Sequence, residues 1–210
     1  MRPDAAWVLA AGWIGQAFFF ARFFVQWIAS ERAGRSIVPR SFWWLSIAAA
    51  ALLSLYTWPR GEPVLLPGFL ITGSLAARNL WLVTRRPKGG AGLGAVPFAG
   101  IGLAAAAALF ASGAFTPRAG LHESPLWLAA GIAGQTLWTS RFLLQWWYAE
   151  RRGMRHFPRA FWWVSLMGNA LLLAYSIHLR DAVYIAGFVP GPLLHVRNLM
   201  LSRDQLARRR

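Results

Sequence analysis

Cysteine is absent from this chain of 210 residues, and acidic residues are scarce. Without cysteine there is no disulfide framework, no Cys-ligated zinc, no iron–sulfur cluster and no thiol nucleophile. Charged residues make up only 14% of the chain, against about 25% in a typical soluble domain. The 22 Lys and Arg outnumber the 7 Asp and Glu, for a formal net charge of +15. Because these cations interrupt long apolar runs, the pattern favours a polytopic membrane protein over a basic nucleic-acid binder.

Long apolar segments are what the chain has in abundance, since 57% of its residues are hydrophobic. A membrane-spanning helix needs about 20 predominantly apolar residues, and about 17 are tolerated. Seven segments approach or exceed that length: Trp7–Ser30, Phe42–Trp58, Val64–Val83, Leu93–Phe115, Leu126–Ala149, Phe161–His178 and Val183–Leu201. The sequence therefore predicts an all-α membrane protein with seven transmembrane helices.

The chain contains an internal duplication. Residues 13–83 align without a gap with residues 132–202, and 27 of the 71 aligned pairs are identical. Each copy holds three predicted helices, and one unmatched helix lies between them, so both copies have the same orientation in the bilayer. This 3+1+3 parallel repeat predicts four parts: a first three-helix repeat at 7–84, a linker transmembrane helix at 93–115, a second three-helix repeat at 126–202 and a basic cytoplasmic tail at 203–210.

The loop charges predict the orientation of the chain. Fourteen Lys and Arg fall on one side of the predicted bilayer and four on the other. Basic loops are retained on the cytoplasmic side of a membrane, so we expect the N-terminus outside and the C-terminus in the cytoplasm.

Four arginines lie inside predicted spans instead of in loops, and they form equivalent pairs in the two copies: Arg22, Arg78, Arg141 and Arg197. An arginine at the centre of a span costs about 2.5–3.5 kcal/mol. Two carboxylates, Glu31 and Glu150, lie on the same side, which is too few for four guanidinium groups. An anionic ligand would complete the balance, and the planar guanidinium suits phosphate in particular. For Arg78, snorkelling to the interface is an equally good interpretation.

Other polar and aromatic side chains accompany these arginines. Gln26 follows Arg22 by four residues and shares its helix face. The glutamines either bind a ligand or form interhelical hydrogen bonds, and both interpretations stay open. We expect the asparagines to orient the inner arginines, and the tryptophans to pack on a sugar face or a lipid headgroup. Besides the arginines, the candidate ligand-binding residues are Gln16, Gln26, Trp27, Asn79, Gln135, Gln145, Trp146 and Asn198.

Catalytic signals are weak. Glu62 and Asp181 map to the outer loops, so no carboxylate is predicted in mid-membrane, where a proton-coupled transporter usually needs one. The four histidines lack metal-ligand spacing, and the chain has no nucleophile–base pair and no phosphate-binding glycine loop. We therefore expect no catalysis by this chain alone, no cofactor and no metal.

The repeated motif resembles the lipid A biosynthesis N-terminal domain, a small membrane module found ahead of the catalytic part of lipid-A-disaccharide synthase. The first copy carries the residues of this resemblance as Arg22-Phe23, Gln26-Trp27, Ser30-Glu31, Pro39, Phe42-Trp43, Ser46, Tyr56, Glu62-Pro63-Val64 and Arg78-Asn79-Leu80. The second copy carries Arg141-Phe142, Gln145-Trp146, Glu150, Pro158, Phe161-Trp162, Ser165, Tyr175, Asp181, Val183 and Arg197-Asn198-Leu199. The module in turn looks like the three-helix PQ-loop/SWEET unit, with Gln26 and Gln145 at the glutamine of its signature.

The resemblance implies a protein of the bacterial inner membrane. We expect it to bind a phosphate-bearing lipid or lipid-linked sugar in a cavity between its repeats, and to present or translocate that lipid during lipid A or surface-glycan synthesis. A SWEET-like transporter of a small soluble solute and a membrane anchor for a glycosyltransferase are the alternatives. No nucleic-acid partner is expected, and a monomer suffices to form one cavity.

Overall fold

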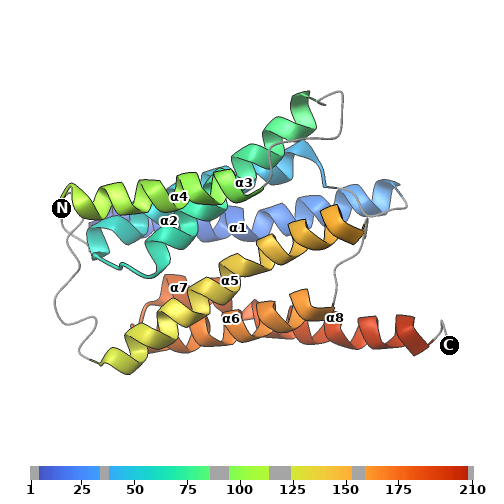
Figure 1. Ribbon diagram of the computed structural model, residues 1–210. Coiled ribbons are helices and arrows are strands. Elements are labelled where there is room, and N and C mark those ends of the chain that lie inside the picture. The colour runs from blue at the N-terminus through green and yellow to red at the C-terminus, as the bar shows by residue number, and fades with distance from the viewer. Residues whose placement is uncertain (1–4, 34–37, 86–94, 114–123, 153–158, 208–210) are drawn as a thin grey trace. The chain divides into compact units, whose positions relative to one another are not determined.

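The computed structural model describes residues 5–33, 38–85, 95–113, 124–152 and 159–207, and all secondary structure in these ranges is helical (Figure 1). The elements, in chain order, are α1 (Ala6–Ala33), α2 (Arg40–Thr57), the 3-10 helix η1 (Trp58–Arg60), α3 (Leu65–Arg85), α4 (Ala95–Ala111), α5 (Pro125–Arg152), α6 (Arg159–His178), α7 (Ala182–Phe188) and α8 (Pro190–Ala207). The predicted all-α class is confirmed.

Three helical stretches in the described residues are long and apolar enough to cross a membrane: Ala6–Ala33, Arg40–Arg60 and Ala160–His178. The linker helix is shorter than expected, because α4 ends at Ala111, and its apolar part is Gly100–Ala111. The seven-span 3+1+3 arrangement therefore stays a prediction.

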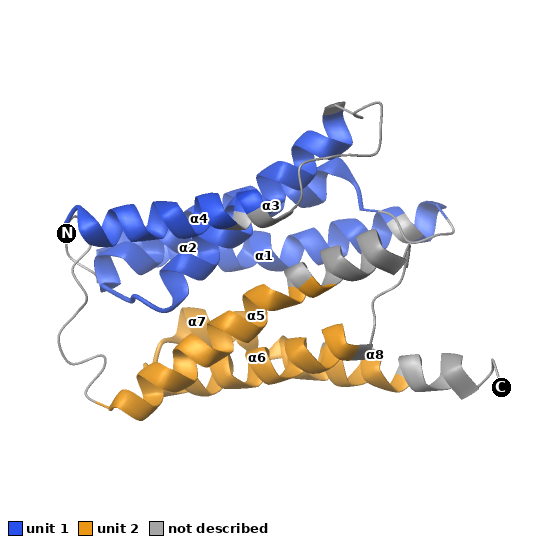
Figure 2. Cartoon of the chain, in the orientation of Figure 1, with its two compact units in different colours: residues 1–119 blue, residues 120–210 orange. Residues whose placement is uncertain are grey.

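The chain divides into two compact units, residues 1–119 and residues 120–210 (Figure 2). In unit 1, α2 packs against both α1 and α3, and α3 also packs against α4. In unit 2, α6 is the central helix and packs against α5, α7 and α8. The second helix of each predicted repeat is thus the centre of its bundle.

Glycines bring the first two helices of each unit into close contact. Gly12 of α1 lies against the ring of Tyr56, and a Cβ at this glycine would be 2.6 Å from the ring. In unit 2 the equivalent Gly131 of α5 lies against Tyr175, where a Cβ would be 3.0 Å from the ring. Small residues allow membrane helices to approach closely, and here each leaves room for one large buried side chain.

The third helix of each repeat is capped by one acidic residue. Glu62 accepts hydrogen bonds from the backbone amides of Val64 (3.2 Å) and Leu65 (2.6 Å) at the start of α3. Asp181 accepts from the amides of Val183 (3.0 Å) and Tyr184 at the start of α7. Both carboxylates are buried. The acidic residue before each third helix is therefore a buried helix cap, which satisfies amides that have no partner within the helix.

The third helix of the second repeat differs from the single segment that the sequence predicts. It consists of α7 and α8, with Val189 between them. Pro190 has no amide hydrogen to donate to the preceding turn, so the helix is interrupted there. The first copy has Ile71 at the equivalent position, and α3 is continuous. Helix α8 also continues to Ala207, beyond the predicted start of the tail at residue 203.

The linker helix α4 packs directly on the backbone of α3. A Cβ at Gly102 would be 2.5 Å from the Cα atom of Ile71 and 2.7 Å from its backbone nitrogen. The hydroxyl of Ser74 in α3 donates to the carbonyl oxygen of Phe98 in α4, at 2.7 Å. The described contacts of the linker with unit 1 thus include this close approach and this hydrogen bond.

Replacing Gly102 with leucine is expected to separate α4 from α3, because a backbone segment inside a helix cannot move aside as a flexible side chain can. With a protease site introduced next to α4, we expect Gly102→Leu to be cleaved faster than the protein that keeps glycine at this position. The matched control is Gly100→Leu, since nothing lies within 4 Å of a Cβ at Gly100. Equal cleavage rates for the two variants would contradict the packing described here.

Candidate functional site: two buried arginines

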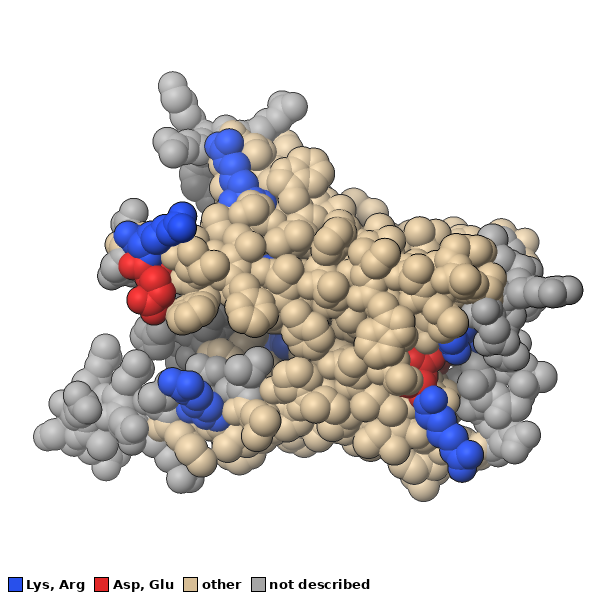
Figure 3. Space-filling view, turned by 180° about the vertical axis from the view of Figure 1, so that it is seen from behind, with Lys and Arg blue, Asp and Glu red and all other residues tan. Residues whose placement is uncertain are grey.

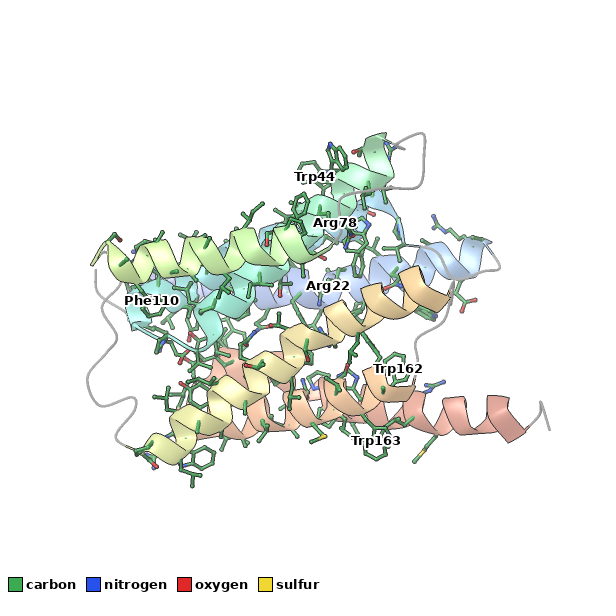
Figure 4. All side chains as sticks on the ribbon, in the orientation of Figure 1. Arg22, Trp44, Arg78, Phe110, Trp162 and Trp163 are labelled. Atoms are coloured by element: carbon green, nitrogen blue, oxygen red, sulfur yellow. The ribbon has the colours of Figure 1, made fainter. Side chains whose placement is uncertain are left out.

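Arg22 of α1 is buried inside unit 1, with 8% of its surface exposed (Figure 4). The guanidinium carbon is 4.0 Å from the ring centroid of Phe19 and 4.8 Å from that of Phe23, the residues three before and one after it. A third ring, that of Phe42 in α2, lies at 5.5 Å. Aromatic faces attract cations, so these three rings hold the guanidinium by cation–π contacts.

A serine fixes the orientation of Arg22. Nη1 of Arg22 donates a hydrogen bond of 3.3 Å to Oγ of Ser46 in α2. The hydroxyl of Ser46 in turn donates to the carbonyl oxygen of Phe42, at 2.7 Å. Nε of Arg22 has no hydrogen-bond partner among the described residues. The contacts of Arg22 in the described part of the chain therefore include three rings and a hydroxyl, and no carboxylate.

Arg141 of α5 is the equivalent residue of unit 2, and it is also buried. Its guanidinium carbon is 3.4 Å from the ring centroid of Trp138, the residue that corresponds to Phe19. The ring of Trp138 also contacts Phe188 of α7 and His195 of α8, with centroid distances of 5.9 and 6.0 Å. Both units therefore place an arginine over an aromatic ring three residues earlier on the same helix.

The two arginines of the third helices are less buried. Arg78 in α3 is half-buried, and its Nη1 donates to Oδ1 of the neighbouring Asn79, at 3.1 Å. Asn79 thus orients Arg78 in this structure. Arg197 in α8 is exposed. Of the four arginines that the sequence singles out, Arg22 and Arg141 are the pair enclosed by protein.

The candidate glutamines that the structure describes differ in how deeply their side chains are buried. Gln16 is buried in α1, whereas Gln26 is half-buried. Gln135 is half-buried, and its Nε2 donates to Oγ1 of Thr139 on the same helix, at 3.2 Å. The side chains of Gln145, Trp146 and Asn198 lie outside the described part of the structure.

Trp27 lies on the outer face of α1. Its side chain is 61% exposed, and its indole nitrogen donates to Oε1 of Glu31, one turn further along the helix, at 3.2 Å. Glu31, which the sequence offered as a partner for the inner arginines, therefore bonds to a tryptophan in this structure. The geometry does not bring Trp27 together with Arg22.

Paired tryptophans at the start of α2 and α6 divide between the interior and the surface. Trp44 and Trp163 are 61% and 50% exposed, whereas Trp43 and Trp162 are half-buried (Figure 4). On the face in Figure 3, most of the described surface is uncharged, and the described charged side chains form a few small, separate groups. Partly exposed tryptophans at the start of these helices are typical of the aromatic belt at a membrane interface.

Sequence reasoning missed several residues around the arginines. Trp138 and Phe42 contact the guanidinium groups, and Ser46 is a hydrogen-bond acceptor. The signal for Trp138 was available, because side chains three residues apart share a helix face. Phe42 and Ser46 come from a second helix, so only the packing of α1 on α2 reveals their role.

These elements define a class of helical proteins whose helices include stretches long and apolar enough to cross a membrane. Each of the two duplicated bundles encloses one arginine that lies against aromatic rings. The model of one family, the Lipid A Biosynthesis N-terminal domain, matches residues 11–81 and again residues 130–200. The chain belongs to this family and contains its domain twice. The two matches bear out the tandem duplication that the sequence predicts.

Lipid-A-disaccharide synthases of Chlamydia are similar to this chain. The protein of Chlamydia pneumoniae is 26% identical over 196 residues, which cover 90% of this chain and 32% of the relative. That of Chlamydia trachomatis serovar D is 27% identical, covering 97% of this chain and 35% of the relative. That of Chlamydia muridarum is 28% identical, covering 93% and 34%. The chain spans about a third of the length of these relatives, and no solved structure matches it significantly.

Proposed function

We propose that this protein serves lipid A or surface-glycan synthesis by binding a phosphate-bearing lipid or lipid-linked sugar in the bacterial inner membrane. Arg22 in unit 1 and Arg141 in unit 2 each bind a phosphate group, and the half-buried Arg78 assists in unit 1. The protein presents the bound lipid to a glycosyltransferase or moves it across the bilayer. Its seven predicted helices span the membrane as a 3+1+3 parallel repeat, with the N-terminus outside and the C-terminus in the cytoplasm.

One observation carries this proposal: Arg22 is enclosed by protein without a carboxylate in its described surroundings. Burial of an isolated charge costs several kcal/mol. Cation–π contacts return about 2 kcal/mol when desolvated, and the bond to Ser46 is long at 3.3 Å. These contacts orient the guanidinium but leave its charge uncompensated. A phosphate group supplies the missing negative charge and accepts two parallel N–H bonds from one guanidinium.

Two further facts favour a lipid as the carrier of that phosphate. Large apolar side chains are exposed along the helices, among them Phe24, Trp44 and Leu193, and lipid is the medium that suits such a surface. The relatives are named for lipid A disaccharide synthesis, and this chain corresponds to about a third of their length. The family thus joins this module to an enzyme of lipid metabolism, which supports a lipid-linked sugar as ligand and a glycosyltransferase as partner.

The proposal is tested by replacing both buried arginines. The double variant Arg22→Ala/Arg141→Ala is purified gently beside the wild type, and the retained lipids are identified by mass spectrometry. We expect one phosphate-bearing lipid to be enriched on the wild type and to fall about tenfold or more in the variant, because each charge-assisted bond is worth about 1.5–3 kcal/mol.

The matched control removes two exposed charges, Arg32→Ala/Arg40→Ala, and should retain the lipid at the wild-type level. The same bulk lipids, in the same amounts, on the wild type and on Arg22→Ala/Arg141→Ala would overturn the proposal.

A further inference from the structure

The two duplicated units differ at two interior positions. Unit 2 has Asn169 in α6 and His195 in α8, where unit 1 has Ala50 in α2 and Ala76 in α3. All four residues are buried. Unit 2 therefore has polar groups in a place where the equivalent bundle is packed with methyl groups.

Neither polar side chain has a hydrogen-bond partner among the residues that the structure describes. Asn169 is 1% exposed, and both its amide nitrogen and its amide oxygen lack a hydrogen-bond partner among the described residues. His195 is 7% exposed, and both of its ring nitrogens likewise lack one in the described part of the chain. Four unsatisfied polar atoms in one small bundle are unusual, because more than about 90% of buried polar groups in proteins have a partner. Each unpaired atom costs about 1–3 kcal/mol, so the bundle is incomplete without something that bonds to them.

Both residues face the contact between α6 and α8. Gly191 of α8 lies against the amide of Asn169 so closely that a Cβ at this glycine would overlap it. His195 follows Gly191 by one helical turn, and its ring lies between two tryptophans. The centroid of Trp138 in α5 is 6.0 Å away, and that of Trp162 in α6 is 6.1 Å away.

The buried arginine of unit 2 belongs to the same cluster. Arg141 lies over Trp138, and the same ring forms a T-shaped contact with His195. Three helices thus bring together one guanidinium, one amide, one imidazole and two indole rings.

We propose that unit 2 is the specificity site of the protein and takes the headgroup of a phosphorylated glycolipid. Arg141 binds the phosphate, and Asn169 and His195 bond to hydroxyl or amide groups of the sugar beside it. This inference rests on the proposed function and goes further, because it assigns sugar recognition to one unit.

The chemistry of the three groups suits such a headgroup. A guanidinium only donates hydrogen bonds and carries a positive charge, which matches phosphate. An amide both donates and accepts, as does a neutral imidazole, which matches sugar hydroxyls. The flat rings of Trp138 and Trp162 provide apolar faces for the C–H side of a sugar. Unit 1 keeps the arginine and has Trp43 at the position of Trp162, but Ala50 and Ala76 replace the two polar groups. It therefore has the means to bind phosphate and lacks the amide and the imidazole that would bond to sugar hydroxyls.

The experiment compares two lipids that share a phosphate and differ in the sugar. Binding of monophosphoryl lipid A and of phosphatidic acid to the purified protein in nanodiscs is measured for the wild type and for Asn169→Ala/His195→Phe. Alanine is the residue that unit 1 has at the position of Asn169, and phenylalanine keeps the ring between the two tryptophans. The matched control is His178→Phe, because His178 is exposed and stacks on Trp127.

We expect the Asn169→Ala/His195→Phe variant to bind monophosphoryl lipid A about tenfold more weakly than the wild type, with phosphatidic acid unchanged. The two single variants give the same contrast, with smaller changes, should the double variant fold poorly. Unchanged affinity for monophosphoryl lipid A, or an equal loss for both lipids, would overturn the inference. If an ordered water, and not a sugar headgroup, bonds to Asn169 and His195, the affinity for monophosphoryl lipid A stays unchanged. The proposed function fails by a different result, namely when Arg22→Ala/Arg141→Ala binds both lipids as the wild type does.

Discussion

Replacing Tyr56 with alanine is expected to lower the free energy of unfolding by about 3–5 kcal/mol. Tyr56 is 1% exposed and fills the space that Gly12 leaves between α1 and α2. Removing the ring leaves a cavity that the glycine cannot fill, and α2 is the helix on which both α1 and α3 pack. The measurement is SDS-induced unfolding in detergent micelles, followed by circular dichroism.

The neighbouring Leu55 provides the control, because it lies on the same helix and is 52% exposed. Leu55→Ala should change the free energy of unfolding by less than about 1 kcal/mol, as exposed substitutions usually do. The equivalent Tyr175→Ala should destabilise unit 2 to a similar extent, since Tyr175 is fully buried against Gly131. A loss below about 1 kcal/mol for both tyrosine variants would show that the ring–glycine contacts do not hold the bundles together.

The duplication explains how much of this fold the sequence predicts. Gln16, Arg22 and Tyr56 recur at a constant offset, and the paired arginines and the paired tyrosines are buried in both bundles. For this reason the order of the helices and the burial of Arg22 and Arg141 follow from the sequence, with no structure at hand. Periodicity also places the helices, although the break at Pro190 in the third helix of unit 2 is visible only in the structure.

The differences between the copies were the part that sequence reasoning could not interpret. Asn169 and His195 appear in the sequence as mismatches of Ala50 and Ala76, and an alignment alone gives a mismatch no meaning. Their significance depends on burial and on the lack of hydrogen-bond partners among the described residues, both of which arise from helix packing. In the same way, Glu62 is a loop acid by position and a buried cap by geometry.

Replacing Arg22 with methionine is expected to stabilise the lipid-free protein and to weaken the binding of phosphate-bearing lipid. The two effects have one cause, since the guanidinium is enclosed without a carboxylate in the described structure. Exchanging buried charges for apolar side chains of similar volume often gains about 1–4 kcal/mol. The cation–π contacts with Phe19, Phe23 and Phe42 return about 2 kcal/mol at most, and methionine keeps part of that value through contacts between its sulfur and the rings.

The measurement compares SDS-induced unfolding of delipidated wild type, Arg22→Met and Arg22→Lys. We expect methionine to raise the free energy of unfolding by about 1–4 kcal/mol. Lysine should leave the stability near the wild-type value, because it keeps the charge while losing the planar fork that binds phosphate bidentately. The exposed Arg32→Met serves as the control and should change neither stability nor lipid binding.

Added lipid should reduce the stability advantage of Arg22→Met over the wild type. A ligand that binds only the folded state at a hundred times its dissociation constant stabilises a protein by about 2.7 kcal/mol. With phosphate-bearing lipid present, wild type is therefore expected to gain about this amount, whereas Arg22→Met gains less because only Arg141 of the two buried arginines remains. If Arg22 instead holds the bundle together through its rings and Ser46, methionine lowers the stability with and without lipid. The sign of the change in the delipidated protein thus separates a residue kept for its ligand from a residue kept for the fold.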